Sequence, residues 1–170
     1  MDDLNRLSVE ESQESRRHPF IVILDDIRSM HNVGSVFRTC DAFWAENIYL
    51  CGYTPCPPHR DIHKTALGAT ETVPWQHFTS TLDAVTHARS LGYHICCIEQ
   101  VHGSIGLAQA HTLPAKTAFV FGNEVSGVAA EVISASDACL EIPQWGSKHS
   151  LNISVTVGVV LWELVRGIIK

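Results

Sequence analysis

The first residues whose types and spacing suit a chemical role are Asn32 and Arg38, in the segment Asn32-Val-Gly-Ser-Val-Phe-Arg38. We expect a helix to begin at Asn32. The N-terminus of a helix presents unpaired backbone N–H groups, and a guanidinium presents a fork of donors that matches a phosphate or a carboxylate. The segment therefore indicates anion binding, whereas the simpler alternative is an ordinary helix cap followed by a surface arginine.

Two more polar segments directly follow apolar runs. Phe121-Gly-Asn-Glu-Val-Ser-Gly127 places Glu124 just past a predicted strand, and Gly122 would let a backbone or a ligand approach closely. The simpler alternative for this segment is a turn with a solvated carboxylate. The segment Ile142-Pro-Gln-Trp-Gly-Ser-Lys-His-Ser-Leu-Asn152 carries polar groups into a last helix, which we expect to begin at Ser150.

The elements that would position these segments alternate along the chain. Short apolar runs predict strands at 20–24, 48–51, 72–74, 93–98, 117–121 and 139–142. Periodic or capped stretches predict helices at 32–43, 62–67, from a cap at Thr79 or Ser80 to about Gly92, at 127–134, and from Ser150 almost to the end. This alternation predicts an α/β domain with a mostly parallel sheet and helices on both faces. Ligands of such sheets bind beyond the carboxyl ends of the strands, where all three polar segments are expected.

The last predicted helix is apolar nearly all round, from Leu151 through Leu164. A helix with so little polar surface is buried. Its cover is either the core of this chain or a second subunit, and the small size of the domain favours a subunit.

Length and composition limit the kind of protein this is. The 170 residues are 45% hydrophobic, and we expect a polar N-terminal extension at 1–18 followed by a single domain at 19–170. The net charge of −6 excludes nucleic-acid binding through bulk positive charge. Six cysteines without a disulfide framework, no signal peptide and no apolar run long enough for a membrane span predict a cytoplasmic protein.

The three segments, taken together and in order, resemble the SpoU (TrmH) family of RNA ribose 2′-O-methyltransferases. The family's first motif is an Asn followed six residues later by Arg, as in Asn32 and Arg38. Its second motif is Gly-x-Glu-x-x-Gly after a strand, as in Gly122–Gly127, and its third is Ile-Pro-x-x-Gly-x-x-x-Ser-Leu-Asn-x-Ser, as in Ile142–Ser154. The resemblance runs from about Phe20 to the end. Val125, Gln144 and Trp145 depart from the residues usual in the family.

The resemblance implies a SPOUT fold whose C-terminal part is threaded into a deep trefoil knot. It implies that the knot forms a pocket for S-adenosylmethionine. By motif match Gly122, Ile142 and Leu151 would line that pocket, and Ile98 would line it through its place at a strand end. It also implies a homodimer through the knotted region, with each active site drawing residues from both chains.

The resemblance further implies roles for the polar residues. Arg38 would act as the base, or as an electrostatic stabiliser of the developing alkoxide, and we favour the stabiliser because a guanidinium is effectively never deprotonated in proteins. Ser150 and the RNA phosphate would relay the proton. Asn32 and Asn152 would hold Arg38 or the phosphate, and Glu124 would orient Arg38 or its loop, or favour the positive charge of the cofactor.

The substrate implied is tRNA or rRNA, bound through a local basic rim in an otherwise acidic protein. The predicted rim consists of Arg16, Arg17, Arg28, Arg60 and Lys64. The alternative is that these are scattered, solvated charges.

Other functions remain open at this point. One is an RNA-binding protein of the same fold without catalysis, and another is methylation of a base nitrogen. Cys51, Cys56, His59 and His63 have ligand types for zinc, but their spacing matches no familiar zinc site. A hydrolase is disfavoured because no Gly-x-Ser-x-Gly turn is present.

Overall fold

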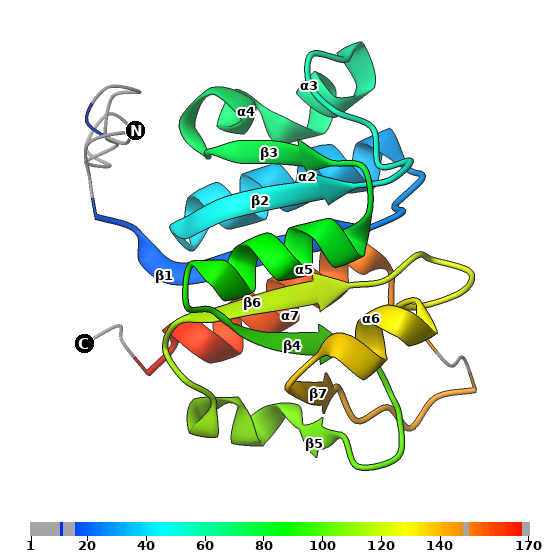
Figure 1. The fold of residues 1–170 in the computed structure, drawn as a ribbon. Coiled ribbons are helices and arrows are strands. Elements are labelled where there is room, and N and C mark those ends of the chain that lie inside the picture. The colour runs from blue at the N-terminus through cyan, green and yellow to red at the C-terminus, as the bar shows by residue number, and fades with distance from the viewer. Residues whose placement is uncertain (1–10, 12–15, 148–149, 168–170) are drawn as a thin grey trace.

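The computed structural model describes residue 11, residues 16–147 and residues 150–167. The predicted extension at 1–18 lies largely outside these residues. Strands and helices alternate along the chain (Figure 1), as the sequence predicts. The elements are β1 (His18–Asp25), α2 (Met30–Ala42), β2 (Ala45–Cys51), α3 (Arg60–Ala66), α4 (Ala69–Thr72), β3 (Trp75–Phe78), α5 (Thr81–Ser90), β4 (His94–Ile98), β5 (Ile105–Gly106), the 3-10 helix η1 (Leu107–Thr112), β6 (Thr117–Phe121), α6 (Ala130–Ala135), β7 (Ala138–Glu141) and α7 (Ile153–Val165).

Seven parallel strands form one sheet in the order β3-β2-β1-β6-β4-β7-β5. β1 lies between β2 and β6, with Leu24 opposite Leu50 on one side and Phe121 on the other. Because every strand runs in the same direction, the carboxyl ends of β1, β4, β6 and β7 meet at one edge. The prediction of a mostly parallel α/β sheet is confirmed.

Helices cover both faces of the sheet, so its central strands are buried on both sides. Alternate residues of β1 face opposite cores: Val22 and Leu24 pack in a cluster with α2 and α7, and Ile21 and Ile23 pack in a cluster with α5 and α6. Figure 1 shows α5 and α6 in front of the sheet and α2 and α7 behind it. Burial on both faces explains why the strands read as continuous apolar runs.

One predicted strand is wrong, and three short elements, α4, β5 and η1, were not predicted. The run at 72–74 is not a strand: α4 ends at Thr72, and the strand β3 begins only at Trp75. Pro74 lacks the N–H that a strand would use, and its carbonyl instead accepts a hydrogen bond from Ile48 N at the start of the pairing with β2. β5 is only two residues long, too short to show a pattern in the sequence. The 3-10 helix η1 has no side-chain cap that would mark its start.

Helices α2, α3, α6 and α7 begin elsewhere than predicted, and the side chains that cap α2, α3 and α7 are Ser29, His59 and Asn152. The N-cap of α2 is Ser29, whose hydroxyl accepts from Asn32 N at 3.2 Å, so the predicted cap at Asn32 is wrong. α7 begins at Ile153 instead of Ser150, because the Asn152 side chain accepts from Ser154 N at 2.9 Å. α6 begins at Ala130 instead of Gly127, whose φ of 70° is not helical. In α2 the side chain of Asn32 is therefore available for other contacts.

The apolar surface of α7 is divided between two faces. Val157 and Leu161 on one face are fully buried against α2 and the sheet. On the other face Val155, Val159 and Trp162 remain 50%, 37% and 52% exposed. The core therefore covers one face of this helix and leaves the second without a cover in the described chain. No helix among the described residues has the length and apolar character that a membrane span requires.

Asp137 ties three elements together on the α5 side of the sheet. Its carboxylate accepts from Arg89 Nη1 at the end of α5 and from Ile95 N in β4, both at 2.8 Å. Burial by itself raises the pKa of Asp137, but the hydrogen bonds from Ile95 and Arg89 outweigh it and bring the pKa below the ordinary value. The folded state therefore holds the ionised carboxylate more strongly than the unfolded state does.

We predict that Asp137→Asn lowers the free energy of unfolding by about 1–3 kcal/mol at pH 7, because two charge-assisted hydrogen bonds are weakened. A carboxyl with a lowered folded pKa stabilises the protein above its unfolded pKa of about 3.9, and this contribution is lost as the pH falls through the folded pKa. The gap between variant and wild type should therefore close below about pH 4. Urea unfolding of both proteins at several pH values measures this difference in the free energy of unfolding. Asp61→Asn, at an exposed pair with Lys64, is the control and should change little.

Candidate active site

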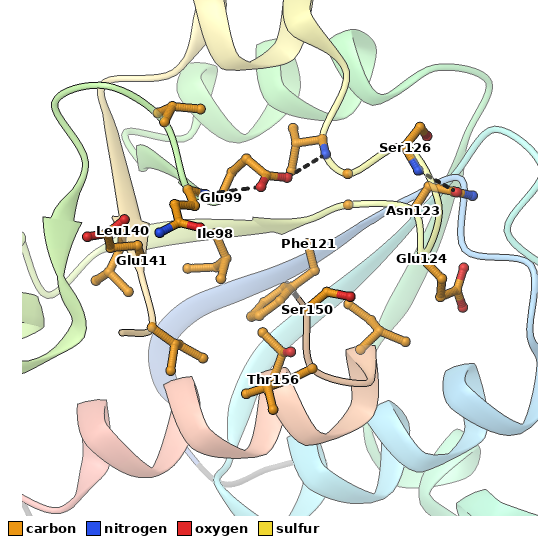
Figure 2. A pocket seen from close by; sticks show the side chains of 18 of the residues that line it. Ile98, Glu99, Phe121, Asn123, Glu124, Ser126, Leu140, Glu141, Ser150 and Thr156 are labelled. Carbon is orange, nitrogen blue, oxygen red and sulfur yellow. Dashed lines mark hydrogen bonds between the residues drawn. The ribbon is translucent and has the colours of Figure 1, made fainter. Parts of the chain in front are cut away.

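A cavity of about 530 Å³ opens at the carboxyl edge of the sheet (Figure 2). Its walls come from the ends of β4, β6 and β7, the loop after β6 and the start of α7. This volume suits a small organic ligand. The four residues predicted to line a cofactor pocket all line this cavity, namely Ile98, Gly122, Ile142 and Leu151.

The loop at residues 122–128, here called the glycine loop, folds back on the end of β6. A Cβ at Gly122 would lie 2.2 Å from Gly127 C and from Val128 N, so no side chain fits there. Asn123 and Gly127 exchange two backbone hydrogen bonds of 3.0 and 2.9 Å. The Asn123 side chain accepts from Val125 N at 2.9 Å and donates to Asp26 O at 2.6 Å. These contacts fix the loop against the ends of β6 and β1.

Hydrogen bonds join the three polar segments singled out by the sequence. Asn32 Nδ2 donates to Glu124 Oε1 at 3.0 Å, and Asn152 Nδ2 donates to Asn32 Oδ1 at 3.3 Å. Glu124 also lies beside Arg28, whose backbone N is 3.5 Å from Oε2. The expected convergence of Asn32, Glu124 and Asn152 is therefore seen at the mouth of the cavity.

Arg38 and Ser150 stand apart from this network. Arg38 is exposed on α2, and among the described residues no hydrogen bond or ion pair joins it to Asn32, Glu124 or Asn152. Residues six apart on a helix are about 120° apart around its axis, so Asn32 and Arg38 do not share a face. Ser150 is exposed and lines the cavity, as Figure 2 shows. Of the roles expected for Glu124, the contacts favour orientation of the first segment and the loop over contact with Arg38.

Of the three residues that depart from the usual family pattern, Gln144 lines the cavity and the other two are strongly exposed. Val125 is 84% exposed and Trp145 is 93% exposed. In the glycine loop only Gly127 has a positive φ, so Val125 adopts a backbone conformation that any residue tolerates. The bulk of Val125 and Trp145 is therefore compatible with the cavity.

The charge of the described cavity wall is negative. Glu99, Glu124 and Glu141 line the cavity, and none of its other described lining residues is ionisable. A negative wall favours a ligand that carries positive charge.

The predicted basic rim is divided between the two ends of the sheet. Arg28 precedes α2, and Arg60 and Lys64 lie on α3. The side chains of all three residues are exposed. α3 is held beside the start of α2, since Thr65 Oγ1 donates to His31 O at 3.0 Å. These three cations therefore lie at the edge that carries the cavity.

Arg17 lies at the opposite end of the sheet. Its guanidinium donates to Thr72 O at 2.7 Å and to Ala45 O at 3.3 Å, at the start of β2. Burial lowers the pKa of Arg17, an effect partly offset by Asp41. Arg17 thus links backbone segments, and Arg16 beside it is also remote from the cavity.

The cysteine and histidine residues considered for zinc do not converge. Cys51 is buried in β2, and the His59 side chain accepts from Asp61 N at 3.1 Å as the cap of α3. Within the described ranges no three His, Cys, Asp or Glu side chains form a group that could hold a metal.

Sequence reasoning missed two residues that shape the cavity. Glu99 follows β4 directly and binds the glycine loop through its carboxylate, and Asn123 holds that loop from within. A carboxylate placed immediately after a predicted strand was the available signal for Glu99. Nothing in the sequence showed which loop it would reach.

Comparison with known proteins supports the family resemblance that the three polar segments indicate. The model of the SpoU rRNA Methylase family matches residues 19–162. The 23S rRNA (guanosine-2′-O-)-methyltransferase RlmB of Neisseria meningitidis serogroup B is 31% identical over 148 residues, which cover 87% of this chain and 58% of the relative.

Two solved structures share the fold. The crystal structure of an AdoMet-bound rRNA methyltransferase from Sinorhizobium meliloti has a TM-score of 0.83 at 26% identity, covering 91% of this chain and 59% of that one. A structure described by its insights into 2-OH methylation of C/U34 on tRNA has a TM-score of 0.77 at 25% identity, covering 89% of this chain and 97% of that one. This chain thus spans less than two thirds of the RlmB relative and of the Sinorhizobium protein, and nearly all of the third. With a family match across most of its length and the family's motifs joined at one cavity, the chain belongs to the SpoU rRNA methylase family.

Proposed function

We propose that this protein binds S-adenosylmethionine in the cavity and transfers its methyl group to a ribose 2′-hydroxyl of tRNA or rRNA. The observation that carries the proposal is the hydrogen-bonded chain Glu124–Asn32–Asn152 at the mouth of the cavity. It unites one residue from each of three segments that are remote in sequence. The family supports the reaction, and the AdoMet-bound Sinorhizobium structure supports the cofactor.

The cavity fits the proposed cofactor in shape and in charge. Ile98, Ile142 and Leu151 offer apolar walls for the adenine ring, and Gly122 leaves backbone groups accessible. The carboxylates of the wall complement a cationic sulfonium. S-adenosylmethionine would supply an electrophilic methyl group on sulfur.

The proposal includes a deep trefoil knot in the C-terminal part of domain 19–170. Two features of the fold support it. β7 lies between β4 and β5, near one edge of the sheet. The chain then returns towards the centre, where α7 packs beside α2.

In the proposed reaction the protein positions the ribose and stabilises its oxyanion. The 2′-hydroxyl would attack the methyl carbon in line, losing its proton as the O–C bond forms and the S–C bond breaks, which leaves neutral S-adenosylhomocysteine. Arg38 acts as the electrostatic stabiliser of the developing alkoxide. Ser150 at the cavity and the neighbouring RNA phosphate relay the proton, while Asn32 and Asn152 orient that phosphate. Glu124 holds Asn32 in place.

The exposed position of Arg38 fits an active site shared between two chains. We propose a homodimer formed through a stripe of exposed apolar side chains on α7, which Leu151 extends just before the helix begins. The stripe consists of Leu151, Val155, Val159 and Trp162, whose spacing of about four residues places them along one side of the helix. In such a dimer Arg38 would act at the cavity of the partner.

The proposed RNA surface is the carboxyl edge around the cavity. Arg28, Arg60 and Lys64 would contact phosphates, and the exposed aromatic rings of Tyr53 and Trp145 are available for stacking on bases. Arg16 and Arg17 are left out of this surface because they lie at the other end of the sheet. We further propose a cytoplasmic location, because all six cysteines are unpaired and burial raises the pKa of Cys51, Cys96 and Cys97 to about 12.

The function is tested by calorimetry with S-adenosylmethionine, followed by mapping of methylated positions in total RNA from cells with and without the protein. We expect binding to the purified protein and a position that resists alkaline hydrolysis only when the protein is present, because a 2′-O-methyl group blocks attack by that oxygen. A methylated position that remains sensitive to alkali would indicate base methylation. Binding of RNA without binding of the cofactor would indicate a non-catalytic relative.

Arg38→Ala should reduce methylation by at least about a hundredfold, because the oxyanion loses its main stabilising donor. The affinity for S-adenosylmethionine should stay within about threefold of wild type, since among the described residues no hydrogen bond or ion pair joins Arg38 to the cavity of its own chain. Methyl transfer from labelled cofactor and calorimetry measure the two effects. A loss of cofactor affinity as large as the loss of rate would show that Arg38 serves binding.

Val159→Asp should convert the dimer to monomers, because it places a charge in the middle of the apolar stripe. Sedimentation velocity measures the change, and methylation should fall together with the dimer fraction. Leu82→Asp is the matched control: Leu82 is 38% exposed and lies on α5, on the opposite face of the sheet. A wild-type protein that sediments as a monomer would refute the shared site.

A further inference from the structure

Glu99 stands at the junction of three segments that form the cavity. It directly follows β4, and its backbone N donates to Leu140 O in β7 at 3.1 Å. Its side chain turns towards the glycine loop, where Oε2 accepts from Val128 N at 3.0 Å. Its other oxygen accepts from Gln100 N, also at 3.0 Å. Figure 2 shows both side-chain contacts.

The loop leaves room for this carboxylate at Gly127. A Cβ at Gly127 would lie 2.4 Å from Glu99 Oε2, so any side chain there would displace it. Gly127 also has a φ of 70°, which L side chains rarely adopt. The two glycines of the motif thus leave space for different groups. The missing side chain of Gly122 leaves space for the backbone of the loop, and that of Gly127 leaves space for the carboxylate that holds the loop.

We propose that Glu99 is a positioning residue, which holds the glycine loop in the shape that binds the cofactor. A carboxylate only accepts hydrogen bonds, and here it receives backbone N–H groups on both oxygens. Charge-assisted bonds of this kind are stronger than neutral ones. Without the carboxylate, Val128 N would lose its partner, and the loop would be tethered to β4 less firmly. This inference rests on the proposed function, since the ligand of the shaped cavity is S-adenosylmethionine.

A purely electrostatic role for Glu99 is the competing explanation, and the chain contains a matched control for it. Glu141 lines the same cavity and also carries a carboxylate. Its Oε2 accepts from Ser104 Oγ at 3.0 Å, on the side of β5, and no hydrogen bond among the described residues joins it to the glycine loop. Glu141→Gln therefore removes one charge from the cavity wall and leaves the loop tether intact.

The test compares wild type with Glu99→Ala, Glu99→Gln and Glu141→Gln. Calorimetry measures binding of S-adenosylmethionine, which carries the sulfonium charge, and of S-adenosylhomocysteine, which lacks it. We expect Glu99→Ala to weaken both ligands by at least about tenfold, because the loss of a charged acceptor changes the loop whichever ligand binds. Glu99→Gln keeps an oxygen for Val128 N and should lose no more affinity than Glu141→Gln.

Hydrogen exchange of the ligand-free proteins gives a readout that does not depend on the ligand. The amide of Val128 should exchange faster in Glu99→Ala and stay protected in Glu99→Gln and Glu141→Gln. Thermal unfolding checks that each variant is folded. If Glu99→Ala itself fails to fold, the exchange and binding of Glu99→Gln decide the matter, since fast exchange of Val128 in that variant refutes the tether.

Two outcomes would overturn the proposal. One is an equal loss in Glu99→Gln and Glu99→Ala that affects S-adenosylmethionine far more than S-adenosylhomocysteine, which would show a charge effect. The other is unchanged exchange of Val128 in Glu99→Ala. If wild type binds neither ligand, the proposed function fails, while the exchange data still show whether Glu99 holds the loop.

Discussion

The close contact between Gly122 and the backbone of Gly127 and Val128 constrains everything at this site. The chain leaves β6, turns within five residues and returns to within van der Waals distance of the strand end, and a Cβ at 2.2 Å would prevent this return. Because the loop is folded so tightly, Asn123 reaches Asp26 after β1, and Glu124 reaches Asn32 on α2. A single missing side chain thus allows the second motif to contact the first.

The parallel sheet brings the remaining parts of the site to the same place. β1, β4, β6 and β7 all end at one edge, so the residues that follow these strands are neighbours in space although they are far apart in the sequence. Asn152 reaches Asn32 through its position at the start of α7, and its own side-chain oxygen also caps that helix. One residue therefore sets both the start of α7 and the link to the first motif. Substitution there would alter the helix and the site together.

The distribution of charge resolves the apparent conflict between an acidic protein and the RNA substrate proposed for it. The cavity wall is negative at Glu99, Glu124 and Glu141, which suits a cationic cofactor. Cations lie outside the cavity, at Arg28 and on α3. The two ligands proposed here thus require opposite potentials, and the fold places the carboxylates in the cavity wall and these cations outside it. A net charge of −6 is compatible with both.

Local patterns in the sequence determined the α/β class, the buried strands such as 117–121, and the three polar segments, because apolar periodicity and motif spacing depend on neighbouring residues alone. They indicated the cap of α5, which is Ser80, but not those of α2 and α7, which are Ser29 and Asn152. Only the tertiary structure decided that Arg17 binds the carbonyls of β2 and α4 and that Glu99 meets Val128. Each of these contacts joins segments far apart in the chain, and packing of the whole domain brings such segments together.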